Sequence, residues 1–434
     1  MTRPNHLTRP NRPVTPVVVN DGGPESAHNR PRRERDDPAP RPSAVPRRKR
    51  TGTQVRNNEK LLDAMVADTD RYGLDDLRSA RVSKAAGLTT GALYSRYENA
   101  DEMLVGLWQH RVAERYLNFV RDAVRYVRSE LPENDPVVHA VEEPTPLLRL
   151  GAEFCVVAPR NITVSEVITP AIVDLFAELG LTAECDPLEG AKVMIAASAA
   201  TGTALRAIVT GTNPGWGAAL RALRAAAFRA ERRSHTADLG DLAPDPINTG
   251  NPVRDALLIS AKRVVANVGF QRATVSRIAR RACLTPSAIY QLWDDKESML
   301  DEAIREVSLL DYAQNSRAKT QAFENQRGDF GFTDSWYFGL MPSRRARLDF
   351  RLECVIASRY HKKTREELRR ALQSSDAILR AAFPRLPHAT TSGIVTMEQA
   401  LGYGFTTVNK FAPAPTRLDY FSMMCALAKL GPLT

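Results

Sequence analysis

LLDAMVADTDRYGLDDLRSARVSKAAGLTTGALYSRYENADEML, at residues 61–104, is matched by LLISAKRVVANVGFQRATVSRIARRACLTPSAIYQLWDDKESML, at residues 257–300. Each counterpart lies 196 positions later, so the two stretches align without a gap over 44 residues. Identical pairs include Tyr94 with Tyr290. Chance is a poor explanation for a register kept over this length. The chain therefore contains one module twice.

The module has the pattern of four short helices. Apolar spacing at i, i+3 and i+4 predicts that helix one buries one face. The residues on that face are Leu61, Met65 and Thr69, and in the second copy Leu258, Ala261, Val265 and Val268. We expect Gly73 and Gly269 to stop this helix in the left-handed conformation, which glycine adopts freely. The second helix is expected at about residues 79–85 and 275–281, with Thr274 as its N-cap.

A tight turn, AAGLT in one copy and RACLT in the other, leads into a third helix. Thr89 and Thr285 are expected to cap it, and Pro286 takes the first helical position, where its missing N–H does no harm. Two helices joined by such a turn form a helix-turn-helix, whose second helix enters the DNA major groove. An ordinary helical hairpin inside an all-α protein is the alternative interpretation.

The specific string is small–small–Gly–apolar–Thr, then x-x-A-[LI]-Y-x-x-aromatic, then polar-x-x-[ED]-x-M-L. Its last part opens helix four, where Asn99 and Glu102 form a capping box and Asp295 is the cap in the second copy. This string resembles the DNA-binding domain of the TetR family of transcriptional regulators over the full length of both stretches. The resemblance implies that each domain precedes an all-helical effector-binding and dimerising domain. The chain looks like two members joined head to tail.

Two positions depart from the family pattern. Cys283 stands where the first copy has the turn glycine Gly87, which weakens the fit of the second turn slightly. Ala100 stands where Lys296 sits in the second copy, which removes a phosphate contact from the first copy.

The expected fold class is all-α, a pseudo-dimeric chain with two helix-turn-helix domains, each followed by an all-helical regulatory and dimerisation domain. The expected divisions are a disordered basic Pro/Arg-rich tail at 1–56, a first TetR-like helix-turn-helix domain at 57–105, a first helical regulatory domain at 106–234, a linker at 235–253, a second helix-turn-helix domain at 254–301 and a second regulatory domain at 302–434. Regulatory helices are expected at 162–179, 189–209, 218–233, 344–358, 364–382, 392–408 and 418–430.

The resemblance implies that the closing pair of helices in each half forms dimers through a four-helix bundle. In our alignment of the halves, Gly202 falls near Gly402. With both pairs on one chain the bundle can close internally and hold two recognition helices about one DNA turn apart, ~34 Å or a multiple of it. Alternatively each half pairs with its own kind, which gives a homodimer with four reading heads.

Composition narrows the class of protein. A hydrophobic fraction of 43% over 434 residues is ample for buried cores, while no run approaches the roughly 18 apolar residues of a membrane span or a signal-peptide core.

The five cysteines are widely spaced, so we expect neither a disulfide framework nor a metal site. This cysteine usage fits a reduced cytoplasm, and we expect the protein to be associated with the nucleoid there. Nucleotide-binding loops, nucleophile elbows and metalloprotease helices are absent from the sequence, so no enzyme activity and no cofactor are expected.

The first 56 residues carry 13 Lys and Arg against 5 Asp and Glu, so this tail holds +8 of the net charge of +10. Its densest cluster is Arg47, Arg48, Lys49 and Arg50, just before the first helix. One interpretation is an arm that grips phosphates or enters the minor groove. The other is a solvated charge run, or a start codon assigned too early.

The residues expected to contact DNA lie on or beside the second and third helices. In the first copy they are Arg81, Thr89, Thr90, Gly91, Tyr94, Ser95 and Arg96; in the second they are Thr274, Ser276, Arg277, Thr285, Pro286, Ser287, Tyr290, Gln291 and Lys296. Gln291 could read adenine through two bonds, and Arg96 a guanine or a phosphate. Tyr97 and Trp293 are expected to pack under helix three. Because the two recognition helices differ, an asymmetric operator is expected.

These features predict a sequence-specific DNA-binding transcriptional regulator, a repressor by resemblance, released by a small apolar effector. The aromatic residues considered for the effector pocket are Trp336, Tyr337, Tyr360 and Tyr403, although aromatic residues in helical bundles are usually core. Two rival hypotheses stay open. One is a sequence-indifferent architectural DNA binder, and the other a protein-interaction module with one non-functional head. Salt dependence, specificity ratio and stoichiometry distinguish them.

Overall fold

The computed structural model describes residues 52–234, 247–307, 340–382 and 388–429. Over these ranges the regular elements are helices and no strand occurs, which confirms the all-α prediction. The basic cluster at residues 47–50, most of the predicted linker, and Trp336 and Tyr337 lie outside the described residues.

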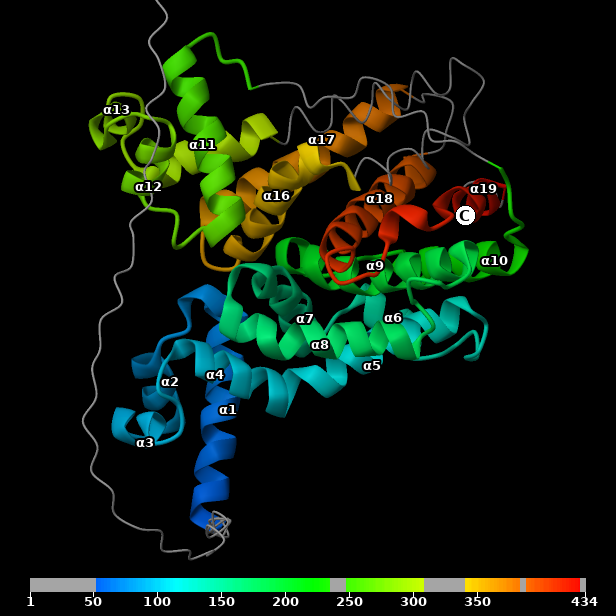
Figure 1. The fold of residues 1–434 in the computed structure, drawn as a ribbon, viewed down its shortest axis with the longest axis horizontal. Coiled ribbons are helices and arrows are strands. Elements are labelled where there is room, and N and C mark those ends of the chain that lie inside the picture. The colour runs from blue at the N-terminus through cyan, green and yellow to red at the C-terminus, as the bar shows by residue number, and fades with distance from the viewer. Residues whose placement is uncertain (1–51, 235–246, 308–339, 383–387, 430–434) are drawn as a thin grey trace, which may run out of the picture. The chain divides into compact units, whose positions relative to one another are not determined.

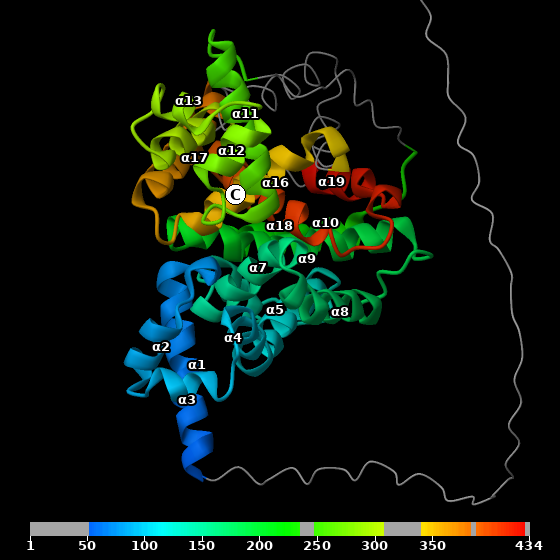
Figure 2. The same ribbon diagram turned by 60° about the vertical axis from the view of Figure 1, so that its left-hand side comes forward.

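Both copies of the module fold into the same succession of helices (Figure 1 and Figure 2). The first copy consists of α1 (Gly52–Tyr72), η1 (Leu74–Asp76), α2 (Ser79–Ala86), α3 (Thr90–Tyr94) and α4 (Ala100–Leu107). The second consists of α11 (Pro252–Val268), α12 (Val275–Arg281), α13 (Pro286–Tyr290) and a helix at residues 296–307. The first helix of each copy buries its expected apolar face, except that Val268 is only partly buried.

Side-chain caps begin these helices largely as expected. The Thr89 hydroxyl accepts from the N–H of Ala92 (3.2 Å), and the Thr274 hydroxyl accepts from that of Arg277 (3.3 Å). At helix four, Asn99 accepts from the N–H of Glu102 (3.0 Å) and Asp295 from that of Ser298 (2.6 Å). The expectation for Thr285 is wrong, because its hydroxyl bonds to that of Ser287 (2.8 Å) instead of capping the helix.

The glycines after the first helices are needed for a different reason from the one expected. Gly73 has φ 78° and ψ 167°, and Gly269 has φ 85° and ψ 163°. This region of positive φ with extended ψ is essentially restricted to glycine, but it is not the left-handed helical conformation that we expected. The left-handed conformation occurs instead in the turn before α3, at Gly87, and Cys283 has a φ of 57° at the equivalent place.

The first regulatory half continues directly from α4. Its elements are η2 (Trp108–Val112), α5 (Ala113–Val127), α6 (Val137–Glu142), α7 (Pro146–Val157), η3 (Ala158–Arg160), α8 (Ile162–Glu178), α9 (Pro187–Thr210) and α10 (Trp216–Arg229). Those of the second half are η4 (Pro342–Arg344), α16 (Arg345–Ala357), α17 (Lys362–Ala382), α18 (His388–Val408), η5 (Pro415–Arg417) and α19 (Tyr420–Ala428). The helices expected from periodicity are all present, with ends that differ by a few residues.

The two halves meet where α9 crosses α18. A Cβ on Gly202 would lie 1.7 Å from the carbonyl oxygen of Ala400, and a Cβ on Gly404 would lie 1.8 Å from that of Ser198. The two helix backbones therefore touch, and only glycine leaves room for this. A shift of 202 positions exchanges the two contacts, so Gly202 corresponds to Gly404, and the expected match with Gly402 is off by two residues. Beside this crossing α10 packs against α19, so the closing pairs of both halves form one bundle.

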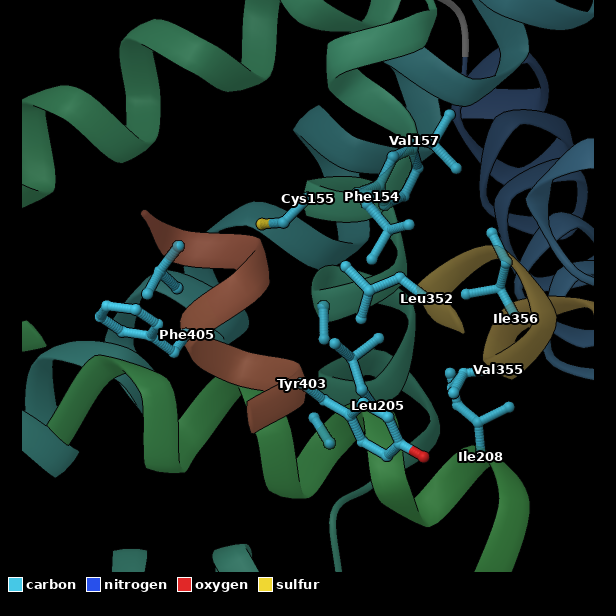
Figure 3. Close-up of a cluster of buried hydrophobic side chains, with 14 of the residues drawn as sticks. Phe154, Cys155, Val157, Leu205, Ile208, Leu352, Val355, Ile356, Tyr403 and Phe405 are labelled. Carbon is cyan, nitrogen blue, oxygen red and sulfur yellow. The ribbon is translucent and has the colours of Figure 1, made fainter. Parts of the chain in front are cut away.

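An apolar core joins the halves next to the crossing (Figure 3). It contains Phe154 of α7, Leu205 of α9, Leu352 of α16, and Tyr403 and Phe405 of α18, each at most 3% exposed. Although α9 is long and apolar enough to cross a membrane, 89% of its most apolar window is buried inside the protein. The helix is therefore the central element of a core shared by both halves.

Candidate nucleic-acid interface

The third helix of head 1, the domain at residues 57–105, is anchored from beneath and exposed on its outer side. Leu93 is fully buried and Tyr97 is 8% exposed, so these two side chains hold α3 against the rest of the head. The residues of α3 and its flanks that we expected to face DNA are exposed, namely Thr89, Thr90, Gly91, Tyr94 and Ser95. The Ser95 hydroxyl also donates to the carbonyl of Ala92 (2.9 Å).

Head 2, the domain at residues 254–301, has the same arrangement. Ile289 is fully buried beneath α13, and Trp293 is 7% exposed. The Trp293 indole N–H donates to the Glu302 carboxylate (2.8 Å), which satisfies its one polar atom. Packing of Tyr97 and Trp293 inside the heads is thereby confirmed. The outer face of α13 and its flanks exposes Thr285, Pro286, Ser287, Tyr290 and Gln291.

One tyrosine occupies the same outer position in both heads. Tyr94 is 54% exposed and Tyr290 is 59% exposed. The Tyr94 hydroxyl is 2.9 Å from that of Ser79 on α2. The residue that corresponds to Ser79 in head 2 is Val275, which offers no hydroxyl. A large exposed aromatic side chain with a polar tip suits contact with a sugar–phosphate backbone better than packing in a core.

Arg81 and Arg277 are equivalent in sequence but differ in their surroundings. Arg81 forms a bidentate pair with the Asp68 carboxylate (2.6 and 2.9 Å), bonds to Asp76 (3.0 Å) and lies over the Tyr72 ring. The hydrogen bond to Asp68 raises the pKa of Arg81. Arg277 is exposed and donates to the carbonyl of Arg272 (3.2 Å). Arg81 is therefore an internal brace, whereas Arg277 faces solvent.

The remaining cations that we expected to contact DNA, Arg96 and Lys296, make contacts within the protein. Arg96 donates to the carbonyls of Ala92 (2.8 Å) and Gln54 (3.3 Å), which ties the end of α3 to the first turn of α1. Lys296 lies 5.7 Å from the centroid of the Phe270 ring and 3.5 Å from the Glu297 carboxylate.

At the start of α12, Thr274 and Ser276 are both exposed. Head 2 also exposes cations that the sequence reasoning missed, namely Arg272, Arg280 and Arg281. Of these, Arg272 lies 3.9 Å from the Asp101 carboxylate of head 1. Alignment of the two stretches at the offset of 196 positions could have revealed two of them. It places Arg281 opposite Ala85 and Arg272 opposite Asp76, so head 2 has a cation where head 1 has a neutral or an acidic residue.

The two heads differ strongly in net charge. Residues 61–104 contain five Lys and Arg against eight Asp and Glu, a net charge of −3. Residues 257–300 contain seven against three, a net charge of +4. Because polyanion binding scales with the number of phosphates that cations neutralise, head 2 is much better suited to the DNA backbone than head 1.

The two described residues of the candidate effector pocket have different surroundings. The Tyr360 ring forms an edge contact with Phe270 (6.5 Å between centroids) and lies 3.5 Å from where a Cβ on Gly73 would be. Tyr403 lies in the shared core, with the Arg351 guanidinium 5.0 Å from its ring centroid. A groove of about 550 Å³ lies elsewhere, lined by residues 158–170 of η3 and α8. Within the described ranges no cluster of His, Cys, Asp or Glu is suited to a metal ion.

Comparison with known proteins bears on head 2. Residues 257–303 match the family model described as bacterial regulatory proteins, tetR family. No curated protein matches the chain. The matched residues include α12, the turn and α13, and the match supports a DNA-binding transcriptional regulator.

Proposed function

We propose that this protein is a transcriptional regulator built from two tetR-type units in tandem, whose two heads read two different half-sites of one DNA operator. The observation that carries the proposal is the outer surface of α13, which lies within the matched residues and is exposed above a buried anchor. In head 1, α3 at the equivalent position 196 residues earlier is likewise exposed above a buried anchor, but it carries different outer residues. We further propose that the protein acts on the nucleoid in the cytoplasm.

The packing of the closing helices supports a pseudo-dimer within one chain. In a dimer of ordinary units, the closing pair of one subunit packs against that of its partner. Here α9 and α10 of the first half pack against α18 and α19 of the second half. The contacts at Gly202 and Gly404 bring backbones together and leave no room for another chain at this crossing. We therefore propose one chain per operator.

Differences between the recognition helices support an asymmetric operator. The outer residues of α3 and its flanks are small or hydroxylated, with Thr89, Thr90 and Gly91 first, whereas those of α13 include Pro286 and Gln291. Glutamine pairs with adenine through two hydrogen bonds in the major groove. Two such different surfaces are not expected to select the same bases.

The charge difference between the heads indicates that they make unequal shares of the phosphate contacts. Head 2 would supply most of the phosphate contacts through Arg277, Arg280 and Arg281, while head 1 needs positive charge from elsewhere. The basic cluster at residues 47–50 precedes α1, whose first turn receives the Arg96 bond at Gln54. We propose that the basic cluster grips phosphates or enters the minor groove next to the half-site of head 1.

Repression, and release by a small apolar effector, follow from the tetR resemblance and are the regulatory part of the proposal. Tyr403 lies in a filled core and Tyr360 at the base of the heads, so we do not assign the effector to these two residues.

An unbiased selection from random duplex DNA by the full chain, with the mass of the complex recorded, tests the proposal. Two dissimilar half-sites bound by one chain are expected. A palindrome bound by two chains would overturn the pseudo-dimer. Binding without sequence enrichment would favour an architectural protein, and a half-site for head 2 alone would favour the interaction-module hypothesis for head 1, whose net charge is −3.

A further inference from the structure

A cluster of buried charged side chains lies where head 1 meets both regulatory halves, and we call it the joint. Its members are Asp70 and Asp75 of head 1, Glu153 and Arg160 of the first half, and Glu353 and Arg359 of the second half. All of these side chains except Asp70 are at most 8% exposed. Charges buried this deeply are stable only where they are paired.

Arg160 bridges the two halves and head 1. Its guanidinium donates to Glu353 of α16 (2.5 and 2.9 Å) and to Asp75 of η1 (3.0 and 2.7 Å). One cation thus holds two carboxylates in two bidentate pairs. A movement of α16 relative to η3 pulls on the same guanidinium that holds head 1.

Arg359 makes the reciprocal bridge from the second half. It donates to Glu153 of α7 (2.7 Å), and to the carbonyl (2.9 Å) and carboxylate (3.0 Å) of Asp70 at the end of α1. The other oxygen of Glu153 accepts the N–H of Leu74 (2.7 Å). The two arginines therefore cross between the halves, and each also holds head 1.

Head 2 lacks the equivalent carboxylates. The residues 196 positions after Asp70 and Asp75 are Ala266 and Gln271. Head 2 is instead attached by the packing of α11 against α16, and by Phe270, which is 2% exposed and contacts the Tyr360 and His361 rings. Head 2 also has polar attachments. Its Asp301 carboxylate accepts a hydrogen bond from the Thr364 hydroxyl (3.2 Å), and Arg160 packs against Gly269. Head 1 differs in that it supplies a carboxylate to each arginine of the joint.

We propose that the joint is an ionic lock that sets the orientation of head 1 relative to the regulatory halves, while head 2 is held by its own contacts with α16 and α17. A displacement of α16 against α7 moves the two arginines and reorients head 1. A ligand or modification that favours the displaced arrangement would change the spacing of the heads. The consequence for DNA rests on the proposed function, whereas the lock itself rests on the contacts above.

Distance measurements between spin labels on the full chain without DNA test the lock. Labels at Thr90→Cys in head 1 or Ser287→Cys in head 2 are each paired with a label at Arg221→Cys on the exposed face of α10, after the accessible thiols of Cys185 and Cys283 are replaced by serine. Measured at pH 8, the distance from head 1 is expected to broaden or shift in Asp75→Asn and Glu353→Gln variants, while that from head 2 keeps the wild-type distribution.

The matched control is Glu178→Gln, which removes an exposed ion pair with Arg121 outside the joint and should leave both distances unchanged. Unchanged head 1 distances in the joint variants, or equal broadening at both heads, would overturn the lock. If Asp75→Asn or Glu353→Gln unfolds the protein, Asp70→Asn repeats the test. Asp70 is the most exposed of the four carboxylates, so its substitution is expected to destabilise the fold least.

A second readout uses the selected operator with two base pairs inserted between the half-sites. The insertion is expected to weaken binding by the wild-type chain roughly tenfold or more, and binding by Asp75→Asn much less, because an unlocked head can follow its half-site. Equal penalties in both proteins would count against the lock. If the wild-type chain selects no operator, the proposed function fails, while the distance measurements still decide the lock.

Discussion

At the scale of single residues, the turn of head 2 contains backbone strain that the turn of head 1 avoids. Cys283 has a φ of 57°, in the region where a side chain clashes with the following carbonyl, and its counterpart Gly87 has a φ of 65°. Cys283→Gly is expected to stabilise the protein by roughly 0.5–1 kcal/mol, since relief of strain exceeds the added entropy of the unfolded glycine. Thermal unfolding measures it.

Gly87→Ala is the reciprocal change in head 1 and should destabilise the protein by about 1 kcal/mol. A Cβ at this position would meet no atom within 4 Å, so the loss comes from the backbone alone. A Cys283→Gly variant that melts at a lower temperature than the wild type would refute the strain argument.

The two equivalent arginines should separate stability from DNA binding. Arg81→Ala leaves the 6%-exposed Asp68 carboxylate without its partner, so a loss of roughly 1–3 kcal/mol in the free energy of unfolding is expected. Arg277→Ala removes a solvent-facing side chain and should change stability by less than about 0.5 kcal/mol. It should instead reduce the slope of log affinity against log salt by about one. Denaturation and salt titration of operator binding measure the two effects, and the opposite assignment would show that Arg81 faces DNA.

At the scale of elements, the crossing of α9 and α18 depends on a glycine at each side. Gly202→Ala would place its Cβ 1.7 Å from a backbone carbonyl oxygen, so the helices must separate and the shared core must open. A loss of more than about 3 kcal/mol is expected, because strain and lost packing add. Thermal unfolding and sedimentation check both stability and association.

The matched control is Gly402→Ala on α18, where the nearest atom to the new Cβ is the flexible tip of Arg351 at 3.4 Å. Alanine has the higher helix propensity, so this variant should be as stable as the wild type or up to about 1 kcal/mol more stable. Similar losses from both substitutions would show that the close approach at Gly202 is not what holds the helices together.

At the scale of the whole molecule, the joint makes stability depend on pH. Burial raises the pKa of Glu353 to about 7, against the opposing effect of Arg160; Asp75 raises it further and Lys410 lowers it. The folded chain therefore binds a proton between about pH 4.5 and pH 7 that the unfolded chain releases. The contribution of this group to stability is present at low pH and is lost as pH rises toward 7, by up to about 3 kcal/mol.

Urea unfolding of the wild type and of Glu353→Gln from pH 5 to pH 8 measures this effect. Subtracting the free energy of unfolding of Glu353→Gln from that of the wild type removes the contributions of the other titrating groups. This difference should fall with rising pH and level off above about pH 7. Two parallel curves would mean that Glu353 stays ionised throughout the range.

Local sequence determined the helices and most of their caps, because these depend on residues a few positions apart, and comparison of the two 44-residue stretches revealed their likeness. The spacing of Leu61 and Met65, the cap at Thr274 and the proline at 286 are sufficient to predict their elements, and the exposed faces of α3 and α13 follow from the same patterns. The tetR resemblance added the DNA-reading role that we propose for those faces. The backbone conformation of Gly73 was not predictable from sequence. A glycine at a helix end can adopt either the left-handed helical conformation or positive φ with extended ψ, and the local sequence does not distinguish them.

Tertiary structure alone decided how the halves are joined. The contacts of Gly202 with Ala400, Arg160 with Glu353 and Arg359 with Glu153 link residues about 200 positions apart, and such pairs leave no local pattern. The same reason explains why Arg81 was expected at the DNA and is instead a brace, because its role depends on Asp68 and Asp76 nearby in space. The sequence around an arginine does not show whether its partner is a phosphate or a buried carboxylate. Only the packing of the folded chain distinguishes the two.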